Sequence, residues 1–470
     1  MHLYSIKLLP IFIFSIHLLQ AQSSSDSLYI IDRIEVSGNE KTKNSVILTE
    51  VRIQKGQSIL CVELDQQLDR IKSNLLRTNL FSKVDIRYII DHREGVNYCN
   101  ISIDVVENWL LFPAPIFDLA DRNFNVWWVE QDRSWKRVNY GLKLFHYNLS
   151  GYRDVLRFVY HTGFTNKFEL NYDFPYLLRK KFVGFRFGGT FTTNKEIDYI
   201  TTGNKNLSIR DENQILLRRR EAYVDFYYRP SATHSLLVGS DIFYNTINDT
   251  VATLNSNYYL EGSRTLRLFA FNVAYQISHL DIQVRPTKGY RLELGMLYQN
   301  GNHHSIQSLL LEQSFAWIKK LNYRTSYFVD AKSREQVLRK PKPFALYKAL
   351  GYADDFVAGY EYYVINGEDY ILWRHGFRIY LFNINRSFFK LLRSEPRIRI
   401  KTEFDLVFSN DLSYVNDPHY AVLNPLSNRL LTGLTLGGEC TINNNIRAQL
   451  QLSINHKREL GFFIHSRSAF

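Results

Sequence analysis

The stretch "RIRIKTEFDLVFS", residues 397 to 409, bears most directly on the fold class of this chain. Strict alternation of charged and apolar residues predicts a β-strand, because successive side chains of a strand point to opposite faces. The charged side chains are Arg397, Arg399, Lys401, Glu403 and Asp405, and the apolar ones are Ile398, Ile400, Phe404, Leu406 and Phe408. A soluble sheet would pack the apolar face on a core, whereas a membrane barrel would turn it to lipid and the charged face to a wet lumen.

The region from Asn108 onward repeats this alternation in segments of about ten residues. Examples are "DVLRFVYHTG" (154–163), "TLRLFAFNVAYQI" (265–277) and "NIRAQLQLSI" (445–454). Roughly sixteen such segments, at about 22 residues per strand and connection, match a sixteen-stranded antiparallel outer-membrane barrel. Short connections alternate with long polar ones, which we place at 189–220, 341–369 and 409–429.

A soluble β-sandwich or a lipocalin-like barrel also alternates, and these folds are the rivals of the membrane barrel. The number of strands and the many charged inward positions favour the membrane barrel. The terminal Phe470 favours it as well, because a final aromatic residue is typical of barrels assembled in the outer membrane. Since beyond the N-terminus no segment approaches the ~18 apolar residues of a membrane helix, the chain is expected to span as strands.

Residues 1–21 are predicted to be a cleavable secretory signal, with Lys7, an apolar run and Ala21 before a Ser cluster. The cysteines at 61, 99 and 440 form no disulfide scaffold and lack metal-ligand spacing. Cys61 and Cys99 lie in one exported region, so a bridge and two buried thiols are both possible. The net charge of +12 suits contact with anionic lipid headgroups or a charged lumen, and no nucleic-acid motif accompanies it.

Residues 28–107 show a different pattern, that of a small mixed α+β domain. "IIDRIEVSGNEKT" (30–42) predicts a strand that ends in a turn, and 43–51 and 62–78 carry apolar residues at helical spacing. Two further strands follow at 83–90 and 97–107. This order, with "I-x-V-x-G-N" and "L-F-S-K-V" (80–84), resembles a POTRA domain, the periplasmic module of polypeptide-transport proteins.

A POTRA domain at 28–107 followed by a barrel at 108–470 resembles the superfamily of BamA, the insertases and translocases of the outer membrane. "NLSGYRDVLRF" (148–158), "NYDFPYLL" (171–178) and "LDIQVRPTKGYRLEL" (280–294) resemble hairpin motifs of that family. Glycine permits a tight turn, and proline must lie outside a ladder because it lacks a donor. The hairpin residues are Asn148, Gly151, Pro175, Asp281, Pro286 and Gly289.

The stretch 356–382, "FVAGYEYYVINGEDYILWRHGFRIYLF", resembles the family most informatively. In the family a loop after the eleventh strand folds into the lumen and carries Val-Arg-Gly-Tyr at its tip, with the Arg paired to acidic groups of the wall. Here the four residues are Val357, Ala358, Gly359 and Tyr360, so the Arg is missing. The acidic residue of relatives aligns with Gly376. Because a lone buried charge is costly, the loss of the loop Arg together with its acidic partner is physically reasonable. Two alternatives stay open: a loop inserted into the lumen and held by packing, and an ordinary surface loop.

The resemblance implies insertion of barrel proteins into the outer membrane of a Gram-negative cell, or passage of a polypeptide or lipid across it. It implies membrane lipid, unfolded clients and other assembly subunits as partners, a periplasmic POTRA domain, and lateral opening between strands near 110–120 and 460–470. No hydrolase elbow, metalloprotease helix, phosphate loop or Cys-x-x-Cys is present, so neither an enzyme nor a cofactor is expected. A passive pore and an accessory barrel of a larger assembly are the alternatives.

Overall fold

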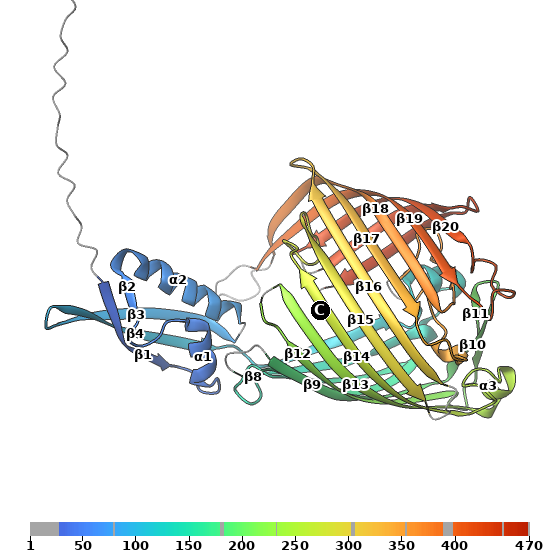
Figure 1. Cartoon of the computed structure of the whole chain (residues 1–470), viewed down its shortest axis with the longest axis horizontal. Helices are drawn as coiled ribbons and strands as arrows, with labels where there is room; N and C mark the ends of the chain where they lie inside the picture. The colour runs from blue at the N-terminus through green and yellow to red at the C-terminus, as the bar shows by residue number, and fades with distance from the viewer. Residues whose placement is uncertain are drawn as a thin grey trace, which may run out of the picture. The chain divides into compact units, whose positions relative to one another are not determined.

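The computed structural model describes residues 28–78, 80–178, 183–231, 233–301, 306–352, 355–388, 398–443 and 446–468. The signal expected at 1–21, Arg397 and Phe470 lie outside these ranges. The chain divides after Asn108 into two compact units (Figure 1). No helix among the described residues is long and apolar enough to cross a membrane.

The N-terminal unit is a four-stranded sheet with two helices. Its sheet order is β2-β1-β4-β3, in which β1 and β4 are parallel and the other pairs antiparallel. The short strand β2 was not expected from the sequence. The elements are β1 (Leu28–Ser37), α1 (Asn44–Val51), β2 (Ser58–Leu60), α2 (Cys61–Arg77), β3 (Phe81–Arg93) and β4 (Val96–Glu107).

The core of this unit lies between α2 and one face of the sheet. Leu64, Leu68, Ile71 and Leu75 recur at three- and four-residue spacing, so they share one side of α2. They are buried in one cluster with residues of β4, including Ile101 and Ile103. Cys99 is buried in the same cluster whereas Cys61 is exposed, and both are free thiols.

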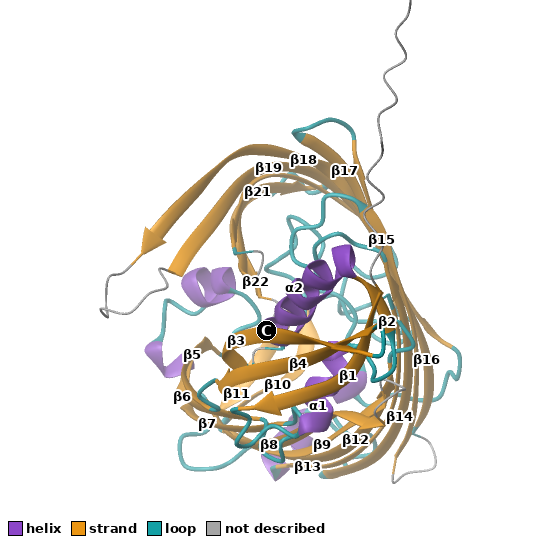
Figure 2. Ribbon diagram, turned by 90° about the vertical axis from the view of Figure 1, so that its left-hand side faces the viewer, coloured by secondary structure: helices purple, strands orange, loops and turns teal. Residues whose placement is uncertain are grey.

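The second unit is a sixteen-stranded sheet in which chain neighbours pair antiparallel from β5 to β22, with β10 and β11 set apart as a two-stranded hairpin. Figure 2 shows the large sheet curling around an interior. Its strands are β5 (Leu111–Leu119), β6 (Val138–Tyr147), β7 (Val155–Gly163), β8 (Thr165–Leu178), β9 (Val183–Asn194), β12 (Leu217–Tyr228), β13 (His234–Ile247), β14 (Thr265–Ser278), β15 (Gly289–Gly301), β16 (Gln307–Lys320), β17 (Thr325–Gln336), β18 (Asp369–Phe388), β19 (Ile398–Asn416), β20 (Leu430–Ile442), β21 (Ile446–Asn455) and β22 (Leu460–Ser468).

Strand β19 shows which way the alternating faces point. Its carboxylates are hidden, with Asp405 only 1% exposed, whereas Phe408 is 48% exposed. The next strands repeat the arrangement. Their exposed apolar residues are Leu434, Leu436, Leu450 and Leu452, and their buried polar ones are Thr435, Glu439, Gln451 and Ser453. This polarity is the reverse of a soluble core, so the soluble-sandwich alternative is wrong.

The long connections carry small elements of their own. The expectation of a loop over 189–220 is wrong at both ends, because β9 runs to Asn194 and β12 begins at Leu217. Gly188 and Gly189, which as glycines suggest a break in the strand, lie within β9. The elements within connections are η1 (Val126–Glu130), η2 (Trp135–Arg137), β10 (Glu196–Thr202), β11 (Lys205–Arg210), α3 (Asp249–Leu254) and η3 (Phe344–Leu346).

The two ends of the large sheet are β5 and β22, the segments that the sequence placed at the site of lateral opening. Among the described residues β5 pairs with β6 and β22 with β21, and no ladder joins β5 to β22. We call these two terminal strands the seam. Each presents an edge whose backbone groups are not paired to another strand.

Candidate functional site

The connection 337–368, between the eleventh and twelfth strands of the sheet, places its tip inside the interior. Val357, Ala358 and Tyr360 are each at most 2% exposed. Gly359 has a φ of +80° and a Cβ there would lie 3.0 Å from the backbone nitrogen of Asn455, so this position requires glycine. We call residues 356–361 the loop tip. Its burial favours an inserted loop over a surface loop.

The loop tip is fixed to the wall by hydrogen bonds. The backbone N–H of Ala358 donates to Asp411 on β19 over 2.9 Å, and the side chain of Asn455 donates to the carbonyl of Gly359 over 2.8 Å. The hydroxyl of Tyr360 hydrogen-bonds His456. These contacts show that backbone groups, as well as packing, anchor the tip.

An ion pair of the wall stands beside the loop tip. Arg374 on β18 donates to both carboxylate oxygens of Asp411, at 2.8 and 2.7 Å, and to the carbonyl of Phe356 at 3.1 Å. The family motif places the cation in the loop, so the motif alone does not indicate this pair. Arg374 lies four residues before Arg378, hence on the same face of β18, and this spacing was the available signal.

The position aligned with the family's acidic residue has no room for a side chain. A Cβ on Gly376 would lie 2.1 Å from the carbonyl oxygen of Phe408. The inward Arg378 instead pairs with Glu439 of β20 at 2.8 Å and donates to the carbonyl of Pro286 at 3.0 Å. The arginines of the wall are therefore paired with carboxylates on the neighbouring strands.

The connection 279–288, between β14 and β15, reaches the same wall. Arg285 is buried and donates to both carboxylate oxygens of Asp405, at 2.5 and 2.6 Å. Within the connection Asp281 accepts the N–H of Thr287 at 2.9 Å, and Gly289 has a φ of +110°. The motif "D-x-x-x-x-P-T-x-G" thus shapes a connection that carries a cation to β19.

The other hairpin residues have local structural roles. Asn148 is buried between β6 and β7, and its side chain accepts the N–H of Arg153 at 2.8 Å. Gly151 in the same turn has a φ of +87°. Pro175 lies in β8 where the register shifts between Phe174 and Leu178, so the ladder avoids its missing donor.

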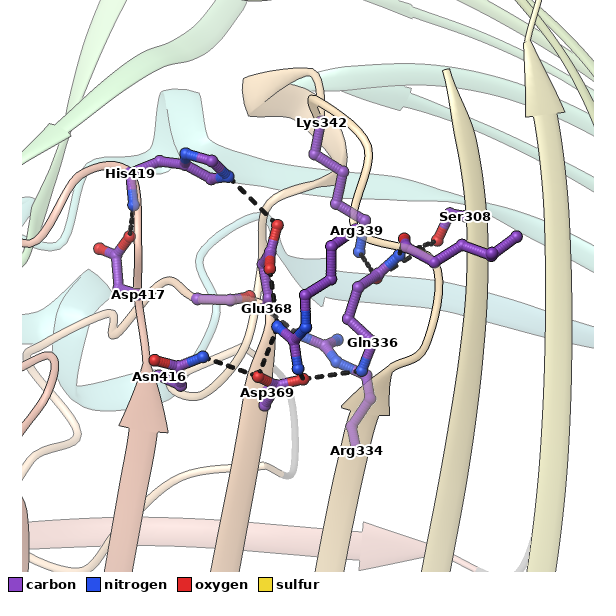
Figure 3. Close-up of polar contacts among 12 residues, drawn as sticks. Ser308, Arg334, Gln336, Arg339, Lys342, Glu368, Asp369, Asn416, Asp417 and His419 are labelled. Carbon is purple, nitrogen blue, oxygen red and sulfur yellow. Dashed lines mark hydrogen bonds and ion pairs between the residues drawn. The ribbon is translucent and has the colours of Figure 1, made fainter. Parts of the chain in front are cut away.

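The base of the connection 337–368 is fixed by a polar network at the rim (Figure 3). Glu368, 1% exposed, accepts from Arg339 at 2.9 Å and contacts the Nε2 of His419 at 3.2 Å. Asp369 accepts from the side chain of Asn416 at 2.8 Å and from the backbone N–H of Gln336 at 2.7 Å. Three strands and the following connection are thereby joined around the base of the loop.

Lys342 at this base provides a pH-dependent prediction. Burial lowers the pKa of Lys342 from its usual 10.5 to about 8, and its ammonium donates to Gln336 at 2.6 Å. Between pH 8 and 10.5 the unfolded chain binds more protons than the folded one, so stability should rise with pH across this window. Urea unfolding at several pH values measures this. Lys342→Met should flatten the rise, and an equal rise in that variant would contradict the assignment.

Gly433 on β20 limits how closely the loop tip can approach the wall. A Cβ there would lie 1.9 Å from the carbonyl oxygen of Ala358. Gly433→Ala should therefore displace the tip and make it accessible to protease, whereas Gly438→Ala, where a Cβ meets open space, should not. Limited proteolysis of the folded protein, with fragments identified by mass spectrometry, measures the difference. Equal protection in both variants would show that the tip does not rest on Gly433.

Among the described residues, no group of three or more His, Cys, Asp or Glu side chains is placed to hold a metal ion. The candidate site is instead a set of interlocked parts. They are the loop tip, the ion pairs of β18 to β20, the connection 279–288 and the seam.

Comparisons with known proteins agree with this architecture. The family model described as "Surface antigen variable number repeat", the POTRA family, matches residues 29–108. BamA from Haemophilus ducreyi lacking POTRA domains 1–3 superposes with a TM-score of 0.63 at 11% identity, covering 93% of this chain and 84% of that one. No curated protein sequence matches the chain.

Two further solved structures share the fold. CdiB from Escherichia coli has a TM-score of 0.53 at 12% identity, covering 94% of this chain and 75% of that one. CdiB from Acinetobacter baumannii has a TM-score of 0.51 at 12% identity, covering 94% and 74%. The chain therefore joins a POTRA domain to a sixteen-stranded antiparallel sheet whose fold is similar to that of BamA and CdiB.

Proposed function

We propose that this protein resides in the outer membrane, where it inserts barrel proteins or translocates polypeptides, with its POTRA domain in the periplasm. The observation that carries the proposal is the seam of a sheet whose outward face is apolar. An unpaired strand edge can template an incoming extended strand through main-chain hydrogen bonds, without nucleotide or cofactor.

The outward face supports the membrane location. Exposed apolar side chains lie on each of the neighbouring strands β18 to β21, where Phe377, Phe408, Leu436 and Leu450 are at least 41% exposed. A contiguous exposed apolar surface of this kind is unfavourable in water and favourable against acyl chains. Unfolded polypeptides, outer-membrane lipid and further assembly subunits are the partners that this function requires.

Depletion of the protein tests the proposal. We expect the abundance of at least one other outer-membrane barrel, or of one secreted polypeptide, to fall while its transcript is unchanged. Quantitative mass spectrometry of the membrane and secreted fractions measures this, and re-expression of the wild-type chain should restore the level. Unchanged levels of every such protein would contradict insertion and translocation, and would favour an accessory role.

A passive pore is the second candidate, and the two segments that enter the interior argue against it. Beside the loop tip and the connection 279–288, the cavity lined by Val284, Ala358, Arg374 and Arg378 has a volume of only about 110 Å³, whereas cavities of about 570 and 600 Å³ lie against the earlier strands. A steady, large conductance of the wild-type protein in planar bilayers would favour the pore. We expect the wild-type protein to show a small and intermittent conductance.

A further inference from the structure

The free edge of β22 is occupied by a side chain from the connection 120–137. Asn125, 6% exposed, donates from its amide nitrogen to the carbonyl of Phe462 at 2.5 Å and accepts the N–H of Ile464 at 2.9 Å. Asn125 lies six residues after the end of β5. A single residue thus links the beginning of the sheet to its last strand.

These two contacts imitate a strand. A carboxamide offers both an N–H donor and a carbonyl acceptor, the two kinds of group that a strand backbone offers to its neighbour. The carbonyl of residue 462 and the N–H of residue 464 flank Phe463, and a residue of a parallel neighbouring strand would bind this same pair of groups. Asn125 therefore fills one ladder position that a further strand would otherwise take.

The neighbours of Asn125 hold the same segment against the loop tip and the residue that follows it. Asn123 donates to the carbonyl of Glu361 at 2.9 Å, and Arg122 donates to the carbonyl of Tyr362 at 2.6 Å. The ring of Tyr362 packs on Phe463, with centroids 5.3 Å apart. The connection, the inserted loop and β22 are consequently held as one assembly near the seam.

We propose that Asn125 is a latch that keeps the edge of β22 occupied at rest and leaves it when that edge pairs with β5 or with a client strand. The gating role rests on the function proposed above. Because the latch fills a single ladder position, an incoming strand that forms several main-chain hydrogen bonds can displace it. Its release would also loosen the contacts of Asn123 and Arg122 with the inserted loop.

Amide exchange at Ile464 tests the latch itself. In protein labelled with ¹⁵N-isoleucine and ¹⁵N-phenylalanine and held in lipid nanodiscs, Asn125→Ala should speed exchange of the Ile464 amide by at least about tenfold, the loss of protection from one or two hydrogen bonds. The amide of Phe463, which alternation turns toward β21, should not change. Asn125→Asp repels the carbonyl of Phe462 but keeps the acceptor for the N–H of Ile464. Its effect on the exchange of the Ile464 amide should therefore be smaller than that of Asn125→Ala. Unchanged exchange at Ile464 in Asn125→Ala would overturn the latch.

Insertion of a urea-denatured barrel client into proteoliposomes tests the gating role. Asn125→Ala should raise the insertion rate by several fold, whereas Asn248→Ala, which removes the N-cap of α3 on another connection, should leave it unchanged. If Asn125→Ala speeds exchange of the Ile464 amide but does not raise the insertion rate, the gating role is overturned, while the hydrogen bonding of Asn125 to β22 stands. If the wild-type protein inserts no client and its depletion changes no other protein, the proposed function fails, and the exchange result still decides the latch.

Discussion

Asp411→Ala is expected to lower the free energy of unfolding by about 3–5 kcal/mol, the cost of leaving a buried partner charge uncompensated. Asp411 has no exposed surface, and it binds both Arg374 and the N–H of Ala358. Its removal leaves the Arg374 guanidinium without its carboxylate and the loop tip without a main-chain anchor. Urea unfolding in detergent micelles, followed by tryptophan fluorescence, measures the loss.

Two further variants make this prediction specific. Asp249→Ala removes a carboxylate paired with Arg264 on the surface, where both side chains are more than half exposed, and should cost at most about 1 kcal/mol. Replacing Arg374 by Met together with Asp411 by Leu removes both charges. The double variant should therefore lose less free energy of unfolding than the sum of the losses in the two single variants. Additive losses would show that the two side chains are not coupled.

Arg285→Met should open the interior from the side of the connection 279–288. The variant leaves Asp405, 1% exposed, without its bidentate partner and removes the tether that holds the connection against β19. We expect single-channel conductance in planar bilayers to increase several fold, with a loss of stability of about 3–5 kcal/mol.

Lys288→Met is the matched control for Arg285→Met. It removes the same charge from the same connection, but Lys288 is exposed, whereas Arg285 is buried and paired with Asp405. Conductance of this control should equal that of the wild-type protein. If both variants conduct alike, charge rather than tethering governs the interior, and the assignment of Arg285 as a tether is wrong.

The sequence predicts the strands better than the contacts that cross the interior. Alternation such as that of residues 401–409 identifies a strand and its two faces, because side-chain direction follows from backbone geometry alone. The distances between Arg285 and Asp405, or between Asn125 and Ile464, depend on how sixteen strands curl. No local pattern encodes that curl, so these pairs could not be read from residue spacing.

The missing loop arginine shows the limit of motif comparison. The motif places the cation in the loop, whereas this chain places it on β18 as Arg374 and keeps the carboxylate on β19. Gly376 could be aligned but not interpreted, because only the approach of the Phe408 carbonyl explains why a side chain is excluded there. Chain order alone placed β5 and β22 at the two ends of the sheet, whereas lateral opening between them stays a prediction.

Both inward-reaching segments are tied to a single strand. The loop tip is held at Asp411 and the connection 279–288 at Asp405, six residues apart along β19, or about 20 Å at the rise of an extended chain. Because a strand is stiff along its own axis, a pull on one tether is carried to the other without any change elsewhere in the wall. Strand β19 thereby fixes the spacing between the loop tip and the connection 279–288, so a molecule that displaces one of these segments is expected to shift the other.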